Sequence, residues 1–339
     1  MKRLIGVLAA LAALGLAGGG LAIWVGLGLL EPVEPGSSRT LAFRVERGQG
    51  LRAVANALEA NELVRDADAV VALARLRGST ATVKAGEYEL SPGWDTGAVL
   101  DHLVAGRVRT YKAVLPEGIR ATEIATRLED AGLTSREEFL RVVNDPAVAQ
   151  SLGVPAKGLE GYLYPETYEL ARDLPAKELA RVLVEQFDVA WREVESAAAE
   201  LSLDKHEIVT LASIVEKETA APEERPLIAA VFLNRLRKGM RLETDPTVIY
   251  GIEGFDGNIR KRDLQDKSNP YNTYQIRGLP PGPIASPGVD ALRAVVEPAD
   301  TEYLYFVSKN DGTHYFSKSY REHVNAVNRY QKRRRSRTR

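Results

Sequence analysis

The sequence predicts an α+β protein behind an N-terminal hydrophobic segment, and three observations support this fold class. Residues 4–30 carry no charge, short alternating apolar segments are typical of strands, and apolar residues three and four positions apart are typical of helices. The chain of 339 residues is long enough for two or three domains with buried cores. Lys and Arg number 45 against 46 for Asp and Glu, so net charge gives no argument for nucleic-acid binding.

The residue types that usually hold metals are scarce. The sequence contains no cysteine, which excludes disulfides and thiol nucleophiles. Its four histidines lack the spacing of metal ligands; they are His102, His206, His314 and His323. We therefore expect neither a metal site nor another cofactor.

Residues 4–30 are predicted to form a transmembrane helix, because this uncharged run can cross the roughly 30 Å hydrocarbon layer of a membrane. Lys2 and Arg3 precede it, whereas Glu31 and Glu34 follow it. The positive-inside tendency places residues 1–3 in the cytoplasm and the chain beyond residue 31 on the outer side. A cleaved signal peptide is the alternative, but the length of the run favours a single-pass anchor.

Residues 31–40 are rich in Pro, Gly and Ser and are predicted to be a linker. An α+β unit follows at residues 41–108. Its expected elements are a strand at 41–45, a helix beginning at residue 51 after a Gly turn, a second helix over 66–76 and a strand over 83–90.

A second unit with a similar order is predicted within residues 109–200. The segment Gly118–Ala121 (GIRA) echoes Gly50–Ala53 (GLRA), which indicates an internal repeat, and a helix is expected over 176–200. The segment LEGYLYPETY at 159–168 precedes this expected helix, and its Tyr162 and Tyr164 offer both flat apolar faces and hydroxyl groups. We expect this segment to line a groove; tyrosines that close a seam between domains are the alternative.

The helix predicted from Asp204 contains the strongest catalytic candidate. Asp204 and Glu207 have the spacing of a capping box. The apolar residues behind them fall on one helix face, at Ile208, Leu211, Ala212 and Val215, and Glu218 continues that face. By this geometry only Glu218 points inward, where apolar neighbours and the helix C-terminus raise its pKa and suit it to act as a general acid. A solvated residue in a frayed last turn is the alternative.

The remaining elements complete a domain over 201–330. We expect a helix from Pro222 to Gly239, a turn at Asp245–Pro246, loops over 269–274 and 278–288, and a helix that starts at Ser286–Pro287. A hairpin over 303–316 and a last helix ending near Tyr330 follow. Residues 331–339 form a basic tail, which is either disordered or in contact with an anionic polymer or lipid surface.

Five motifs occur in order along the second half of the chain: IVEKET at 214–219, NRL at 234–236, MRLETDPTVIYG at 240–251, YNTY at 271–274 and GLPPGPIASPG at 278–288. Together they resemble the endolytic murein transglycosylase (YceG-like) family, and the resemblance covers nearly the whole chain. Residues 41–108 resemble LysM, a small module that binds polymers of N-acetylglucosamine; a plain spacer is the alternative. The resemblance implies a lysozyme-like α+β catalytic domain at 201–330, outside the bacterial cytoplasmic membrane.

In that family the second Glu of EKET is the catalytic acid/base, so the resemblance assigns this role to Glu218. It implies endolytic cleavage of peptidoglycan between N-acetylmuramic acid and N-acetylglucosamine, which leaves 1,6-anhydro ends and terminates nascent strands. It also implies peptidoglycan synthases (penicillin-binding proteins) as partners. Around the acid we expect sugar-binding groups at Tyr271, Asn272, Tyr274, Thr244 and Asp245, together with Tyr162 and Tyr164.

Two other functions are compatible with the sequence. A hydrolytic muramidase would use Glu243 or Asp245 as a second carboxylate. A protein of another class, a non-catalytic peptidoglycan-binding scaffold for synthases, would need no acid at residue 218.

Overall fold

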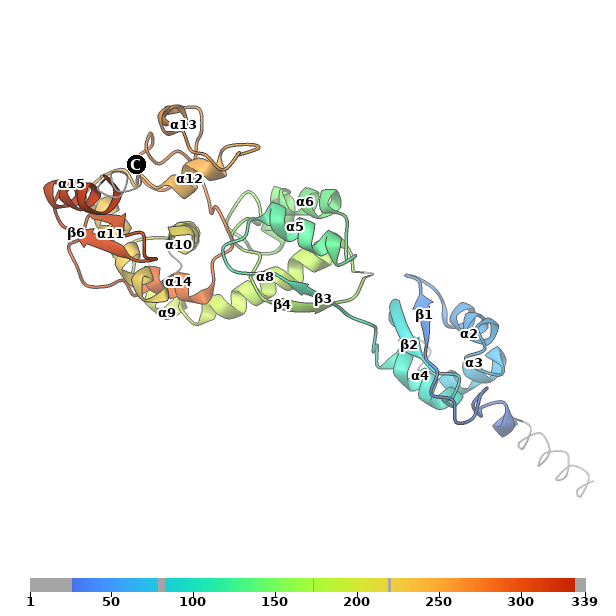
Figure 1. Ribbon diagram of the computed structural model, residues 1–339. Helices are drawn as coiled ribbons and strands as arrows, with labels where there is room; N and C mark the ends of the chain where they lie inside the picture. The colour runs from blue at the N-terminus through green and yellow to red at the C-terminus, as the bar shows by residue number, and fades with distance from the viewer. Residues whose placement is uncertain (1–25, 79–82, 173, 219–220, 333–339) are drawn as a thin grey trace, which may run out of the picture. The chain divides into compact units, whose positions relative to one another are not determined.

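The computed structural model describes residues 26–78, 83–172, 174–218 and 221–332 (Figure 1). The chain divides into two compact units, of which the first ends at Tyr111 and also takes in Ala171 and Arg172. The second begins at Lys112 and contains the remaining described residues. The regions 109–200 and 201–330, which the sequence suggests as separate, thus belong to one unit apart from a few residues at the division.

The predicted transmembrane segment lies outside the described residues except for 26–30, and the basic tail lies outside them except for 331–332. In the part of the chain that the structure describes, no helix is both long and apolar enough to cross a membrane.

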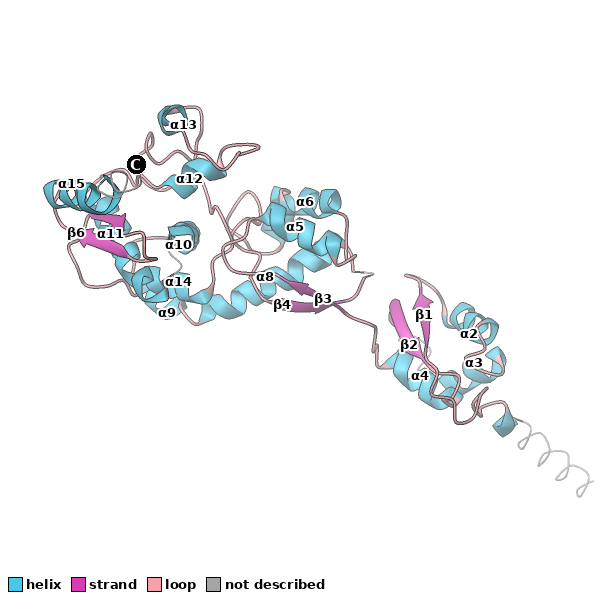
Figure 2. Ribbon diagram, in the orientation of Figure 1, coloured by secondary structure: helices cyan, strands magenta, loops and turns pink. Residues whose placement is uncertain are grey.

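The first unit contains an antiparallel pair of strands, β1 (Leu41–Val45) and β2 (Gly86–Leu90), in which Phe43 lies opposite Tyr88. Its helices are α2 (Leu51–Ala60), α3 (Ala67–Leu76) and α4 (Thr96–Val104) (Figure 2). One core joins the strands to the helices; it includes Phe43, Val54, Leu58, Tyr88 and Leu103, each at most 4% exposed. The expected strand at 41–45 and both expected helices are confirmed.

The structure of this unit differs from the expected one in two respects. The strand expected over 83–90 begins only at Gly86, whose φ of +151° is disfavoured for side-chain-bearing residues. The helix α4 was not expected from the sequence, although Asp95 is a typical helix-capping residue: its side chain accepts from Ala98 N at 2.7 Å, and Val99 and Leu103 are buried.

The second unit starts with the same order of elements. The strand β3 (Tyr111–Val114) leads to α5 (Ala121–Asp130), α6 (Arg136–Val143) and α7 (Pro146–Ser151), and β4 (Thr167–Leu170) returns to pair with β3. The helix expected over 176–200 is two helices, α8 (Ala176–Arg192) and α9 (Glu195–Ala198).

The rest of the second unit surrounds one buried helix, α10 (Lys205–Glu218), which contacts α11 (Arg225–Arg237), α12 (Asp245–Tyr250) and α14 (Val289–Val296) (Figure 1). A 3₁₀ turn, η1 (Pro222–Glu224), precedes α11, and α13 (Lys261–Gln265) lies beyond α12. The chain then forms the hairpin β5 (Tyr305–Ser308) and β6 (His314–Ser317), followed by α15 (Tyr320–Val327) and a π-helical turn, η2 (Asn328–Lys332).

The environment of α10 differs from the one expected. The capping box is present, because Asp204 N donates to Glu207 Oε2 at 2.9 Å and Glu207 N donates to Asp204 Oδ1 at 2.8 Å. However, the whole run 208–215 is buried, not one face, because the small polar residues on the opposite side, such as Ser213, also pack inside. A helix in this position is held on all sides, so its last residue is placed rigidly.

Two further expectations are wrong for the same region. Glu218 is not the only acid at this end of α10 that points inward, because the Glu216 side chain is 6% exposed, pairs with Arg225 at 3.0 Å and accepts from Gly288 N at 3.1 Å. Asp245–Pro246 is not a simple turn but the first turn of α12, where proline is tolerated because its missing N–H would have no helical partner.

Candidate active site

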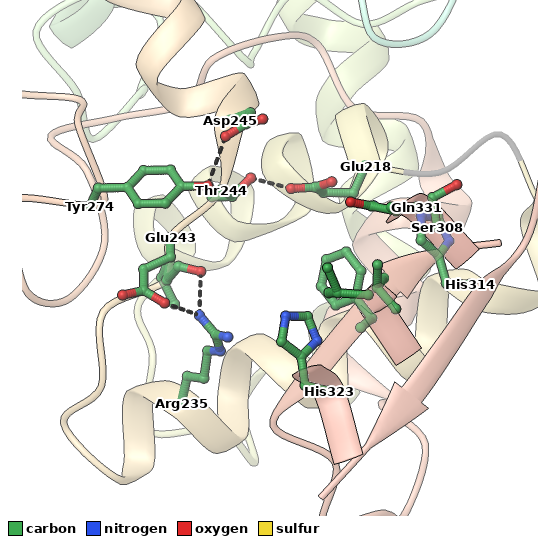
Figure 3. A pocket seen from close by; sticks show the side chains of 14 residues that line it. Glu218, Arg235, Glu243, Thr244, Asp245, Tyr274, Ser308, His314, His323 and Gln331 are labelled. Atoms are coloured by element: carbon green, nitrogen blue, oxygen red, sulfur yellow. Dashed lines mark hydrogen bonds and ion pairs between the residues drawn. The ribbon is translucent and has the colours of Figure 1, made fainter. Parts of the chain in front are cut away.

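A cavity of about 450 Å³ opens at the C-terminal end of α10, and Glu218 lines it. Segments distant in the sequence supply its other polar groups: Arg235, Glu243, Thr244, Asp245, Tyr274, Ser308, His314, His323 and Gln331 (Figure 3). The structure therefore brings Glu218 together with three residues predicted to lie beside it, namely Thr244, Asp245 and Tyr274.

The hydroxyl of Thr244 donates a hydrogen bond to Glu218 Oε1, and the two side chains point toward one another in Figure 3. Thr244 is itself held by two buried threonines. Its N–H donates to Thr273 Oγ1 at 3.1 Å, and its carbonyl accepts from Thr247 Oγ1 at 2.8 Å. The position of the carboxyl group is thus fixed from the side opposite to α10.

Asp245 and Tyr274 form the polar wall next to Thr244. The Tyr274 hydroxyl donates to Asp245 Oδ1 at 2.7 Å. Burial raises the pKa of Tyr274, and its hydrogen bond to Asp245 raises it further, so Tyr274 stays protonated as a donor at neutral pH. Asp245 is exposed, and Tyr274 engages one of its two carboxyl oxygens.

Arg235 of α11, which is 8% exposed, holds the segment that precedes Thr244 and forms the floor of the cavity. Its guanidinium donates to the carbonyl of Leu242 at 2.8 Å and lies 3.3 Å from Glu243 Oε2. Glu243 has a φ of +51°, in the left-handed region that a glutamate seldom adopts. Such backbone strain clusters at functional sites, where the surrounding contacts maintain it.

His314 and His323 complete the cavity, and neither was expected there from the sequence. The backbone N–H of His314 donates to Glu224 Oε1 at 2.8 Å, and the imidazole Nδ1 of His314 lies 2.6 Å from Glu224 Oε2. Burial lowers the pKa of His323, and the charge of Arg235 lowers it further. No local pattern marks these residues, because the contacts join segments about 90 positions apart. Within the described ranges no group of His, Cys, Asp and Glu is suited to hold a metal ion.

The surroundings of Glu218 shift the pKa of its carboxyl group away from the usual value. Although part of the residue is exposed to the cavity, burial raises the pKa of Glu218 to about 7. The Thr244 hydrogen bond acts in the opposite direction and the charge of Asp245 raises the pKa again. The direction agrees with that expected from the sequence. Such a group is available near neutral pH both as a proton donor and as a proton acceptor.

The other predicted sugar-binding residues lie elsewhere. Tyr162 and Asn272 have fully buried side chains; the Tyr162 hydroxyl lies 3.0 Å from His206 Nδ1, and the Asn272 amide donates to three backbone carbonyls, including that of Asp266 at 2.7 Å. This geometry gives both a structural role. Tyr164 lines neither this cavity nor the next. Tyr271 lines a second cavity at the other end of α12.

Comparison with known proteins gives three kinds of match. The YceG-like family model matches residues 43–329. A Bacillus subtilis (strain 168) protein named endolytic murein transglycosylase is 32% identical over 321 residues, which make up 90% of this chain and 89% of that protein. A Streptococcus pneumoniae serotype 2 (strain D39) protein of the same name is 29% identical; the match covers 87% of this chain and 59% of that protein.

The fold has a match among solved structures as well. A 2.6 Å crystal structure of a yceG-like protein from Listeria monocytogenes is 31% identical in sequence and has a TM-score of 0.59. The match covers 86% of this chain and 100% of that one.

Proposed function

The chain belongs to the YceG-like family, and from this premise we propose how the cavity around Glu218 acts on its substrate. The protein is an enzyme, a lytic transglycosylase that cleaves the glycan strands of peptidoglycan. One observation carries the assignment of its catalytic group: the Glu218 carboxyl accepts a hydrogen bond from Thr244 in a polar cavity, where burial raises its pKa to about 7.

In the proposed reaction, protonated Glu218 donates its proton to the glycosidic oxygen between N-acetylmuramic acid and N-acetylglucosamine. The bond from this oxygen to the anomeric carbon of the muramic acid then breaks. The carboxylate of Glu218 takes the proton of the muramic acid C6 hydroxyl, whose oxygen bonds to the anomeric carbon and forms the 1,6-anhydro ring. No water is consumed, and the tethered hydroxyl has the advantage of proximity over a free nucleophile.

Asp245 and Tyr274 have supporting roles in this proposal. Positive charge develops on the sugar ring as the glycosidic bond breaks, and the negative charge of Asp245 in the same cavity stabilises it. The hydrogen bond from Tyr274 holds the Asp245 carboxylate in place at 2.7 Å. Asp245 would instead be the second carboxylate of a hydrolytic muramidase, so the products must be identified directly.

The test of the reaction is mass spectrometry of purified peptidoglycan digested by the full chain and by the Glu218→Gln variant. We expect anhydro-muramic ends with the parent chain and none with the variant. Reducing muramic ends would indicate hydrolysis instead. Intact strands that bind the protein would leave the scaffold function.

The pH dependence of cleavage follows from the pKa of Glu218. The first step requires the protonated form, which is about 90% populated one pH unit below the pKa and about 10% populated one unit above it. We therefore expect kcat/KM to be level up to about pH 6 and to fall toward a tenfold loss per unit above about pH 7. An activity that rises between pH 7 and pH 9 on soluble glycan oligosaccharides would contradict this assignment.

Replacing Thr244 by Val tests the hydrogen bond to Glu218. The hydroxyl stabilises the charged form of the carboxyl group, so its removal should raise the pKa of Glu218 and move the alkaline fall of kcat/KM upward by roughly one pH unit. Thr244→Ser retains the hydroxyl and is the matched control. Equal displacement of the two profiles would show that the hydroxyl is not responsible.

We extend the proposal to location. Residues 4–30 anchor the chain in the bacterial cytoplasmic membrane and place the cavity on the outer side; the uncharged run and the flanking Lys2, Arg3 and Glu31 support this. Membrane fractionation with alkaline extraction tests it. Release of the chain by alkaline carbonate would refute a spanning anchor.

Strand termination and partners belong to the same proposal. Endolytic cleavage close to the membrane would end the elongation of nascent strands, and residues 41–108 would act as a LysM-like glycan-binding module beside the synthases. The order β1, α2, α3, β2 supports the module assignment. Cells that lack the protein should then have longer glycan strands. Peptidoglycan synthases should also co-purify with the full chain. Unchanged strand length would remove the termination role.

A further inference from the structure

The second unit contains another cavity, of about 670 Å³, which the reaction proposed above does not use. Glu160, His206, Tyr250, Tyr271 and Pro281 are among the residues that line it. Glu160, His206 and Tyr250 are polar groups that hydrogen bonds within the protein hold in place. A concave surface with a few convergent polar groups is the usual form of a ligand site.

Two helices contribute residues both to this cavity and to the one at Glu218. The helix α10 contributes His206 from its first turn here and Glu218 from its last residue there, about 18 Å apart at 1.5 Å per residue. The helix α12 begins with Asp245 in the catalytic cavity and ends with Tyr250 in this one. A separation of about 18 Å corresponds to several sugar residues of an extended strand.

The polar groups of the second cavity are held in position before any ligand arrives. Glu160 Oε1 accepts from Ala121 N at 3.0 Å, and Glu160 Oε2 accepts from the Tyr250 hydroxyl at 3.1 Å. His206 Nε2 lies 3.1 Å from the Pro281 carbonyl. Burial raises the pKa of Glu160 to about 7, so the carboxyl group can both donate and accept hydrogen bonds near neutral pH.

Aromatic surface lies beside these polar groups. The rings of Tyr250 and Tyr271 are tilted against one another with centroids 4.6 Å apart, and the Arg120 guanidinium lies 5.0 Å from the centroid of Tyr250. Tyr271 is half-buried, and its hydroxyl has no hydrogen-bond partner among the described residues. Two aromatic rings and the free Tyr271 hydroxyl next to a carboxyl group suit sugars, which present both apolar C–H faces and hydroxyl groups.

We propose that this second cavity binds an N-acetylhexosamine residue of the glycan strand, several sugars away from the bond that is cut. The inference rests on the proposed function, because it assumes that the strand occupies the cavity at Glu218. The neutral hydroxyl and acetamide groups of a sugar suit Glu160 in either protonation state. The carboxylates of a stem peptide would meet both Glu160 and Lys157 in this lining, so binding of the peptide is a separate outcome of the test. Such a site makes the enzyme favour long strands over short fragments.

The test measures equilibrium binding of glycan oligosaccharides to the full chain that carries Glu218→Gln, so that the ligand is not consumed. The probes are peptidoglycan oligosaccharides freed of stem peptides by an amidase, in a short series that fills only the catalytic cavity and a long series that reaches both. We expect the long series to bind at least about tenfold more tightly, which corresponds to about 1.4 kcal/mol.

Two variants of this chain test whether the second cavity causes the preference. Ala156→Trp fills the cavity from a half-buried loop residue, and Tyr271→Ala removes its aromatic surface. Both should reduce the ratio of short to long dissociation constants to about one. Ala147→Trp is the matched control, since Ala147 is exposed on neighbouring α7 and does not line the cavity. Thermal unfolding of each variant checks that the fold is kept.

Three outcomes overturn the proposal. The parent chain could bind both series equally, or the preference could survive both variants. A preference seen only with strands that retain stem peptides would assign the cavity to the peptide. Failure of the proposed reaction is a separate result, because it appears as an absence of anhydro ends from the parent chain, whereas these binding ratios do not depend on chemistry.

Discussion

Replacing Glu218 by Gln is expected to lower the rate of glycan cleavage by about 10³- to 10⁴-fold, the upper part of the range for loss of a general acid/base. The amide keeps nearly the same shape, and it can still accept the hydrogen bond from Thr244, but it cannot donate a proton to the glycosidic oxygen. The measurement is the initial rate at which anhydro ends form on strands of defined length, at pH 6, where most of the parent enzyme is protonated.

Glu243→Gln is the matched control for this substitution. Glu243 lines the same cavity and lies 3.3 Å from Arg235, but it has no part in proton transfer. Its replacement should leave the rate within about tenfold of the parent rate, the scale of one modest polar contact. A Glu218→Gln variant that keeps more than a tenth of the parent activity would disprove the assignment, as would an equal loss in both variants.

The same Glu218→Gln variant should be more stable than the parent at alkaline pH, which distinguishes loss of chemistry from loss of folding. The pKa of Glu218 is about 7 in the folded chain against 4.5 for the free group, so the folded state holds this proton more tightly. The stability from this group is present below pH 4.5 and is lost as the pH rises through about 7. Gln avoids that loss, and urea unfolding at pH 8 should show a gain of about 1–3 kcal/mol.

The sequence predicts the individual elements of this site better than it predicts how they pack together. The helix at 205–218 was predictable because its start is marked by the adjacent capping pair of Asp204 and Glu207, and its core residues repeat at helical spacing. Burial on all sides of this helix was not predictable, because a small polar residue such as Ser213 is usually exposed to solvent. Its hydroxyl in fact donates to the Thr210 carbonyl at 2.7 Å and accepts from Ile284 N at 3.0 Å.

The residues around Glu218 could be predicted only in part, and on a different basis. Resemblance to a family pointed to Thr244, Asp245 and Tyr274 through their motifs, and the structure places them in one cavity. Nothing local indicated His314 or Glu224, which meet only through the packing of the β5–β6 hairpin. Tyr162 and Asn272 lie in equally conspicuous motifs, yet their side chains are buried. A motif marks a residue as important without separating contact with substrate from support of a loop.

Replacing Arg235 by Ala is expected to lower the free energy of unfolding by about 3–5 kcal/mol, the cost of breaking a buried charged network. Its guanidinium donates to the carbonyls of Leu304 at 2.7 Å, Arg241 at 3.1 Å and Leu242 at 2.8 Å. Alanine leaves these carbonyls without a donor and opens a void under the segment that carries Thr244. Urea unfolding measures the change.

Arg237→Ala is the control for this prediction, since Arg237 lies in the same helix but is exposed, and its loss should cost within about 0.5 kcal/mol. Arg235→Lys keeps the charge, but its compact ammonium group cannot match the positions of the two guanidinium nitrogens that face the three carbonyls, so its stability should fall between those of the parent and Arg235→Ala. A loss below 1 kcal/mol for Arg235→Ala would mean that water replaces the guanidinium at no great cost. The ordering parent, Lys, Ala would instead show that the floor of the catalytic cavity depends on the forked geometry of arginine.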